Sequence, residues 1–200
     1  MIVTVVLAAG TGSRVGGPKA LLLVDDLPLA ALHAQRRLSR ESDRVVLVVR
    51  KEVAGALAKT GLGATGPRVR VVVSDEPEAL GPAGSLRAAL VAGAFVPEDR
   101  LLITPVDVLP ASARLTHTLL GALDEHEAAR PSHGHPIALR ASVLDPAFRA
   151  DPAPLRDVLS LLGDRCAVVD VDGAEDFDTP EDLARVAGVA NVRFFGEEAP

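Results

Sequence analysis

Aromatic residues are almost missing from this chain: its 200 residues include five Phe, and Tyr and Trp are absent. Proteins that bind single-stranded nucleic acid stack the bases on aromatic side chains, so the sequence disfavours that class of protein. Lys and Arg form no cluster, and the formal net charge is −6. We therefore expect no long-range attraction to nucleic acid or to an anionic membrane surface.

Cysteine and long apolar runs are also scarce. Cys166 is the single cysteine, which excludes an internal disulfide and a metal site built from several cysteines. The apolar start "MIVTVVLAAG" is too short to cross a bilayer and lacks the basic residues of a signal peptide. No later run reaches membrane length without charges. The sequence therefore predicts a soluble, cytoplasmic protein with no membrane partner.

Apolar, β-branched runs alternate with Ala- and Leu-rich helical patterns along the chain. Strands are predicted at 2–8, 44–49, 69–73, 101–103, 136–139 and 167–171, and helices at 30–40, 52–59, 84–94, 111–126, 154–162 and 180–186. Strands that are apolar on both faces and separated by helices favour an α/β fold with a mainly parallel sheet covered on both sides. We predict a single domain over residues 1–190 and a C-terminal tail over 191–200.

Ligands of such sheets bind at the carboxyl ends of the strands, and a glycine-rich segment, "GTGSRVGGPK", follows the first strand. Glycines let a phosphate approach the backbone amides, and Arg14 and Lys19 add two cations. The segment lacks the Gly-Lys-Ser/Thr ending of a P-loop, and its third glycine is misplaced for a dinucleotide-binding motif. The segment therefore predicts a phosphate site that is neither a P-loop nor a dinucleotide-binding loop. The alternative is a simple glycine-rich turn that carries two solvated charges.

Two later strand ends carry further candidates. Asp107 follows the strand in "LLITPVD", where a carboxylate suits Mg²⁺, although an Asp there can also start a turn. The segment "SDEPEALGPAGSL" places Gly81 and Ser85 near a helix start, where free amides hold an anion or a base edge. Ser85 suits an N-terminal helix cap equally well.

Histidine and aspartate cluster toward the C-terminal end. His133 and His135 have no third nitrogen or sulfur ligand at useful spacing, so zinc is not expected. In "DFDTPEDL", a hydroxyl cap, a proline and acids in the first helical turn account for 179–182. Helix capping does not account for Asp176 and Asp178, because both precede the capping residue Thr179.

The stretch "LAAGTGSRVGGPKALLLVDDLPL" (7–29) resembles the signature loop of the MobA-like NTP transferases, L-A-A-G-x-G-x-R-x-G-x-x-K. Among them it is most similar to the molybdenum cofactor cytidylyltransferases, although Leu23 replaces a usual proline and a common glycine before "PL" is missing. The resemblance implies a three-layer α/β/α fold with a mainly parallel, mixed sheet, of the nucleotide-diphospho-sugar transferase (GT-A-like) type.

The resemblance also implies site residues. Arg14, Lys19 and Asp107 would be catalytic, and His135 would bind the acceptor. Asp107, with Asp176 or Asp178, would hold the cofactor Mg²⁺. Nucleotide-binding positions would be Leu7, Ala8, Ala9, Gly10, Gly12, Ser13, Arg14, Lys19, Asp75, Gly81 and Ser85.

The implied activity is magnesium-dependent transfer of a nucleotidyl group from CTP or GTP to a small phosphorylated acceptor, most similar to molybdopterin, with release of pyrophosphate. A sugar 1-phosphate, methylerythritol phosphate or phospholactate-type acceptor would leave the loop and Asp107 unchanged. A non-catalytic nucleotide-binding protein or cofactor chaperone, and a purely structural domain, are the alternatives. The sequence leaves the oligomeric state open, with a monomer among the options.

Overall fold

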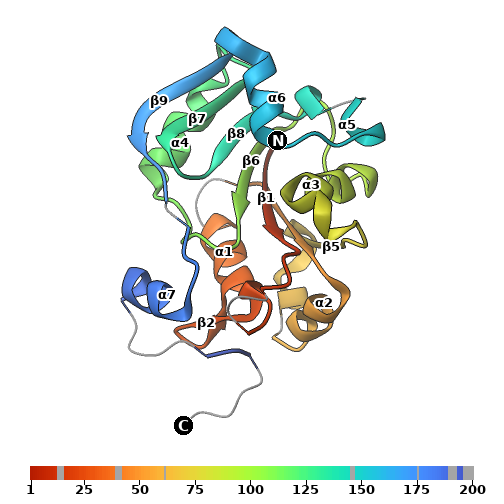
Figure 1. Ribbon diagram of the computed structural model, residues 1–200, viewed down its shortest axis with the longest axis vertical. Coiled ribbons are helices and arrows are strands. Elements are labelled where there is room, and N and C mark those ends of the chain that lie inside the picture. Colours follow the sequence, from red (N-terminus) through yellow and green to blue (C-terminus); the bar gives the residue numbers. More distant parts are fainter. Residues whose placement is uncertain are drawn as a thin grey trace.

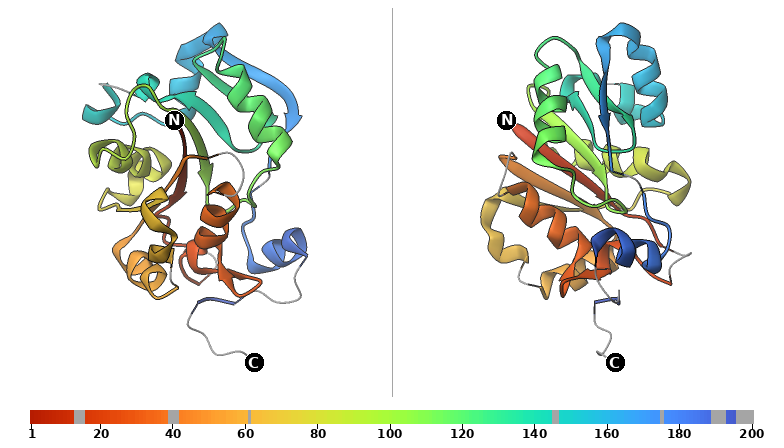
Figure 2. Two further views of the ribbon diagram at one scale, coloured as in Figure 1. Left: turned by 180° about the vertical axis from the view of Figure 1, so that it is seen from behind. Right: turned by 90° about the vertical axis from the view of Figure 1, so that its left-hand side faces the viewer.

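The computed structural model describes residues 1–12, 16–38, 42–60, 62–144, 147–174, 176–188 and 193–195. A seven-stranded sheet with the order β5-β4-β1-β6-β8-β7-β9 runs through the molecule, and helices lie on both of its faces (Figures 1 and 2). Its strands are β1 (Ile2–Ala8), β4 (Arg44–Val49), β5 (Val69–Val73), β6 (Arg100–Pro105), β7 (Ala128–His133), β8 (Ile137–Arg140) and β9 (Cys166–Asp172). The helices are α1 (Leu29–Leu38), α2 (Lys51–Ala58), α3 (Gly81–Val91), α4 (Ala113–Ala122), α5 (Ala147–Ala150), α6 (Leu155–Leu162) and α7 (Pro180–Ala187). A small separate hairpin consists of β2 (Leu23–Val24) and β3 (Leu27–Pro28).

Strand direction explains where the site forms. β1 pairs in parallel with β4 and β6, and β4 pairs in parallel with β5. The carboxyl ends of these four strands therefore open on one edge of the sheet. β8 runs antiparallel to both of its neighbours, β6 and β7, which makes the sheet mixed and mainly parallel, as predicted.

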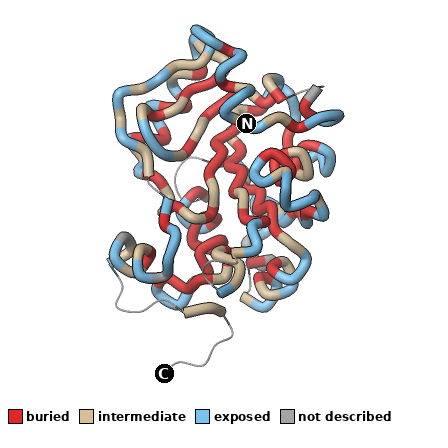
Figure 3. Tube along the Cα trace, viewed as in Figure 1, coloured by how far each residue is buried: buried red, intermediate tan, exposed pale blue. Residues whose placement is uncertain are grey.

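The core divides into the two sides of this sheet. Along β1, Val3 and Val5 pack toward α3 and α6, whereas Val6 and Ala8 pack toward α1 and α2. This alternation follows from the two-residue period of a strand. A continuous buried path runs through the central strands, with exposed segments around it (Figure 3). The predicted three-layer α/β/α architecture is confirmed.

Most predicted elements are present, and the differences concern β7, the bounds of α3 and α4, and the short elements β2, β3 and α5, which were not predicted. β1, β4 and β5 have the predicted bounds. β7 was not predicted, because "AARPSH" contains a proline and polar residues that obscure a strand pattern. The helix predicted at 111–126 ends at Ala122, and α3 begins at Gly81, three residues before the predicted start.

Beyond α7 and its cap Gly188, the structure describes residues 193–195. There the backbone N–H of Leu23 donates to the Arg193 carbonyl at 2.8 Å, and Phe194 forms a β-bridge with Leu22. These three residues thus pack back on the hairpin. The boundary between a domain of 1–190 and a tail of 191–200 stays a prediction. In the described part of the chain, no helix has both the length and the apolar character needed to cross a membrane.

His33 links α1 to the segment that follows β6. Its side chain is fully buried, and its Nε2 lies 2.8 Å from the Val108 carbonyl oxygen. Nε2 must donate in this contact, so it carries a proton. Burial lowers the pKa of His33 to about 4, and the charge of nearby Arg37 acts in the same direction.

This pKa predicts a loss of stability in mild acid. Because the folded pKa is depressed below the ordinary 6.5, the neutral ring contributes fully above that pH, and the contribution is lost as the pH falls toward 4. We expect the free energy of unfolding to fall by up to ~3 kcal/mol from this group. In His33→Gln, whose amide can still donate to Val108, urea unfolding should show a correspondingly weaker pH dependence between 6.5 and 4. An identical pH dependence in both proteins would contradict the assignment.

Candidate nucleotidyl-transfer site

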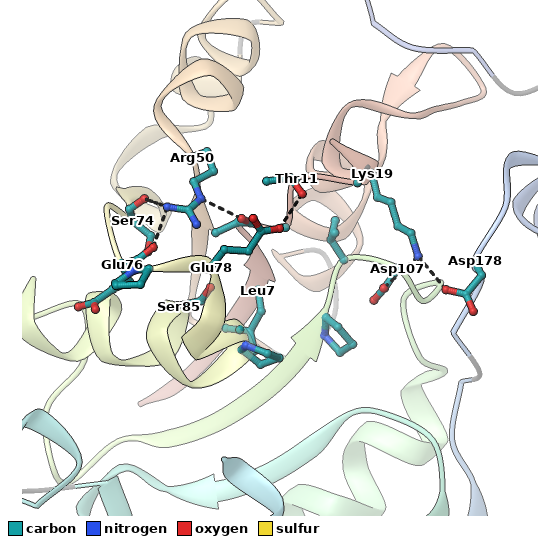
Figure 4. Close-up of a pocket in the computed structure, with 18 residues that line it drawn as sticks. Leu7, Thr11, Lys19, Arg50, Ser74, Glu76, Glu78, Ser85, Asp107 and Asp178 are labelled. Atoms are coloured by element: carbon teal, nitrogen blue, oxygen red, sulfur yellow. Dashed lines mark hydrogen bonds and ion pairs between the residues drawn. The ribbon is translucent and has the colours of Figure 1, made fainter. Parts of the chain in front are cut away.

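A cavity of about 410 Å³ lies at the carboxyl ends of β1, β4, β5 and β6 (Figure 4). Glycines and small residues form one wall, and charged side chains stand at its two ends. The lining residues that the sequence predicted are Leu7, Ala9, Gly10, Gly12, Lys19, Gly81, Ser85, Asp107 and Asp178. Most of the proposed nucleotide site is therefore brought together by the fold.

The glycine-rich loop doubles back on itself. Gly12 has a φ of +64°, and a Cβ atom there would overlap the carbonyl oxygen of Gly17. The Gly17 N–H donates to the Gly12 carbonyl oxygen at 3.2 Å. Glycine is thus required at position 12 both by conformation and by space. The predicted residues Ser13 and Arg14 lie outside the described residues.

Lys19 emerges from this loop at one end of the cavity. Its Nζ donates to the Phe177 carbonyl oxygen at 2.6 Å and to Asp107 Oδ2 at 3.2 Å, and lies 3.5 Å from Asp178 Oδ1. It also sits 5.3 Å from the centre of the Phe177 ring. The Lys19 side chain is 14% exposed, so screening by water is limited. One ammonium group and two carboxylates thus meet here, with the Asp107 side chain partly buried and the Asp178 side chain 70% exposed.

Backbone contacts explain why these carboxylates meet. The Val106 N–H donates to the Leu7 carbonyl, and the Phe177 N–H donates to the Asp107 carbonyl, at 3.0 and 2.9 Å. Phe177 is buried in the core. Asp178 lines this cavity, and Asp176 lines a second one.

Asp176 and His135 form a pair at the second cavity. His135 Nε2 lies 3.6 Å from Asp176 Oδ1. Backbone hydrogen bonds in both directions between His135 and Ala174, at 3.0 and 2.8 Å, hold the two segments together. Burial raises the pKa of Asp176, and the nearby Asp107 carboxylate raises it further. The charges of His135 and Lys19 act on this pKa in the opposite direction.

Ser85 lies at the opposite end of the first cavity. The capping alternative fails for it, because α3 begins at Gly81 and places Ser85 within the helix. Its side chain is buried and lines the cavity. Across the mouth, the Thr11 hydroxyl donates to Glu78 Oε1 at 2.8 Å. The helix cap predicted at Thr179 is confirmed, since its hydroxyl accepts from the Asp182 N–H at 3.1 Å.

Two predicted nucleotide-binding residues do not line the cavity. The Ala8 side chain packs in the apolar core under α1. Asp75 is exposed, and its neighbours Ser74 and Glu76 line the cavity instead.

Sequence reasoning missed Arg50, which follows β4. Its Nε donates to the Ala9 carbonyl at 3.1 Å, and its Nη1 donates to the carbonyls of Ser74 and Glu76 at 3.3 and 2.8 Å. One guanidinium thus ties together the segments that follow β1 and β5. A charge at the end of an apolar strand was the available signal, but the backbone acceptors come from distant parts of the chain.

Arg50→Met is expected to loosen this end of the cavity without touching the residues around Lys19. Removing a charged donor costs about 1.5–3 kcal/mol per contact group, so we expect KM for the nucleotide to rise about tenfold or more while kcat changes little. Steady-state kinetics would check this. A tenfold fall in kcat with an unchanged KM would show that Arg50 does not act by shaping the nucleotide cavity.

The second cavity, of about 900 Å³, adjoins the first. Both are lined by Leu7, Gly81, Pro82, Pro105 and Asp107. The second one extends under α6, with apolar walls from Ile103, Ile137, Leu155, Leu159 and Val168. Asp107 therefore stands at the junction of two binding spaces, which is the geometry a reaction between two bound molecules needs.

Comparison with known proteins agrees with this geometry. The model of the MobA-like NTP transferase domain matches residues 4–166. A probable molybdenum cofactor guanylyltransferase from Methanothermobacter thermautotrophicus is 36% identical over 104 residues, which are 50% of this chain and 50% of that protein. The match thus spans about half the length of that curated relative.

Solved structures share the fold. Rv0371c from Mycobacterium tuberculosis has a TM-score of 0.73 at 22% identity, over 94% of this chain and 97% of that one. A putative glucose-1-phosphate thymidylyltransferase from Bacillus anthracis has a TM-score of 0.70 at 17% identity, over 94% of each chain. These structures show that the chain shares an α/β fold with them. The chain belongs to the MobA-like NTP transferase domain family.

Proposed function

We propose that this protein transfers a nucleotidyl group from CTP or GTP to a small phosphorylated acceptor and releases pyrophosphate. The observation that carries the proposal is the convergence of Lys19, Asp107 and Asp178 beside the glycine-rich loop, where two cavities join. The first cavity would take the nucleotide, with its phosphates toward Lys19 and its base toward Ser85.

The residues present fit a magnesium ion. Asp107 and Asp178 already gather around one cation, the Lys19 ammonium, and carboxylate oxygens are the ligands that Mg²⁺ prefers. Among the described residues no group of three or more His, Cys, Asp or Glu could hold a metal. Mg²⁺ in such sites takes one or two carboxylates and completes its shell with phosphates and water. Bound there, it would neutralise and polarise the phosphate oxygens.

The chemistry needs little from the side chains beyond position and charge. An oxygen of the acceptor phosphate attacks the α-phosphorus of the NTP. The bond from that phosphorus to the bridging oxygen breaks, and pyrophosphate leaves with the electron pair. No general base is needed, because the acceptor phosphate is already an anion. Lys19 would stabilise the charge that develops on the phosphate oxygens, and the glycine-rich loop would hold the triphosphate in line.

The acceptor would occupy the second cavity, with His135 at its inner end. Apolar walls favour a phosphate ester with a flat or apolar body over the polyol of a sugar 1-phosphate. A molybdopterin-type acceptor meets this requirement, and the curated relative supports it. We therefore place it ahead of the other phosphorylated acceptors.

A screen of the four common NTPs against candidate acceptors, with Mg²⁺ present, tests the proposal. We expect pyrophosphate release with CTP or GTP that depends on a molybdopterin-type acceptor. A nucleotide-binding chaperone would instead bind NTP equally well with and without Mg²⁺ and release no pyrophosphate from any pair. Turnover with a sugar 1-phosphate alone would keep the reaction type and replace the acceptor.

A further inference from the structure

Arg130 lines the second cavity and is not used by the proposed chemistry. It lies on β7, where it pairs in register with Val168 of β9, and its side chain is partly buried. Its hydrogen bond runs from Nη1 to the carbonyl oxygen of the next residue, Pro131, at 3.3 Å. Within the described residues no carboxylate pairs with it. A guanidinium with unused donors beside apolar walls is suited to an anion.

Arg156 provides the contrast within the same cavity. It pairs with Asp157 at 3.3 Å, and its side chain is 85% exposed. Water and a neighbouring carboxylate already satisfy this arginine. Arg130 is therefore the better candidate for a ligand contact.

The thiol of Cys166 lies in the field of Arg130. Burial raises the pKa of Cys166, and the Arg130 charge lowers it in part. Both residues line the cavity. Because Cys166 is the single cysteine of the chain, it can report on this part of the cavity without any engineering.

Sheet order separates Arg130 from the reacting centre. Asp107 follows β6, Arg130 lies on β7, and β8 stands between these two strands. Two strand spacings amount to roughly 10 Å. The backbone of Arg130 therefore lies two strands away from Asp107, so its guanidinium is placed to contact a different part of an acceptor from the phosphate that reacts.

We propose that Arg130 binds a second anionic group of the acceptor, at the far end of an apolar body from the phosphate that reacts. The acceptor class is thus a phosphate monoester with a flat or apolar middle and a distal anion. This inference rests on the proposed function, because it assigns the second cavity to the acceptor.

Two synthetic probes test it: benzyl phosphate, and 4-carboxybenzyl phosphate, which adds a distal carboxylate. The measured quantity is the rate at which N-ethylmaleimide alkylates Cys166, relative to the unliganded rate of the same protein. We expect 4-carboxybenzyl phosphate to protect the thiol at a concentration at least about tenfold lower than benzyl phosphate, as a charge-assisted contact predicts. Equal concentrations for the two probes in the wild type would overturn the proposal.

Variants locate the preference. In Arg130→Gln the two probes should protect equally, whereas Arg156→Gln should keep the wild-type preference. Preference retained in Arg130→Gln would also overturn the proposal, and the comparison of probes in the wild type needs no variant to fold.

The assay needs no nucleotide, which separates this inference from the proposed function. If the wild type prefers 4-carboxybenzyl phosphate but releases no pyrophosphate from any NTP, the Arg130 site is supported and the proposed transferase activity is contradicted. If the protein releases pyrophosphate but the two probes protect Cys166 equally, only the proposed Arg130 site is contradicted.

Discussion

Asp107→Ala is expected to lower kcat for pyrophosphate release by at least ~10²-fold, comparable to the loss of a main electrostatic contact in the transition state. Asp107 stands at the junction of both cavities and contacts Lys19. Without it, the proposed magnesium ion would lose its central ligand, and the charge on the transferring phosphate would be poorly neutralised. KM for the nucleotide should rise as well, because a magnesium ion held there would also contribute to binding the substrate phosphates.

Asp151→Asn is the matched control for this variant. Asp151 is exposed, lies between α5 and α6, and lines neither cavity, so its activity should stay within about twofold of the wild type, as for surface substitutions in general. Measurements at several Mg²⁺ concentrations would show whether the loss in Asp107→Ala follows the metal. Turnover in Asp107→Ala within a few-fold of the wild type would show that the metal assignment is wrong.

Lys19→Met should lower kcat/KM for the nucleotide by about 10²–10³-fold. The substitution keeps an apolar side chain but removes the ammonium group, which lies over the Phe177 ring and carries the charge proposed to hold the triphosphate. It also leaves Asp107 and Asp178 without the cation that lies between them. Binding of the NTP, measured by calorimetry, should weaken even where no acceptor is present.

Lys59→Met is the control, since Lys59 is exposed at the end of α2 and lines neither cavity. Lys19→Arg should recover part of the binding but less of the rate, because a guanidinium fork cannot fill the position of a point charge. If Lys19→Met bound and turned over NTP as the control does, the cavity would not be the phosphate site.

Much of this fold and site follows from sequence patterns. The strands β1, β4 and β5 are apolar on both faces, so their bounds could be predicted to the residue. Strand direction then brings the residues that follow them to one edge, which is how Lys19 and Asp107 could be paired before their contact was seen.

Other features depend on contacts that no local pattern reveals. The role of Arg50 requires knowing which backbone carbonyls surround it, and those belong to segments 24 to 41 residues away. The start of α3 was placed too late, because Gly81 and Pro82 are typical of turns, although proline suits the first turn of a helix. The pairing of β7 between β8 and β9 sets the second cavity, and its proline-containing sequence does not predict a strand.

The most direct test of the central claim is identification of the products formed from an NTP and a phosphorylated acceptor. With CTP or GTP, Mg²⁺ and a molybdopterin-type acceptor, mass spectrometry should find the acceptor enlarged by one nucleoside monophosphate. Pyrophosphate should appear in equal amount. Release of orthophosphate, or recovery of unchanged NTP from every pair tested, would contradict nucleotidyl transfer by this protein.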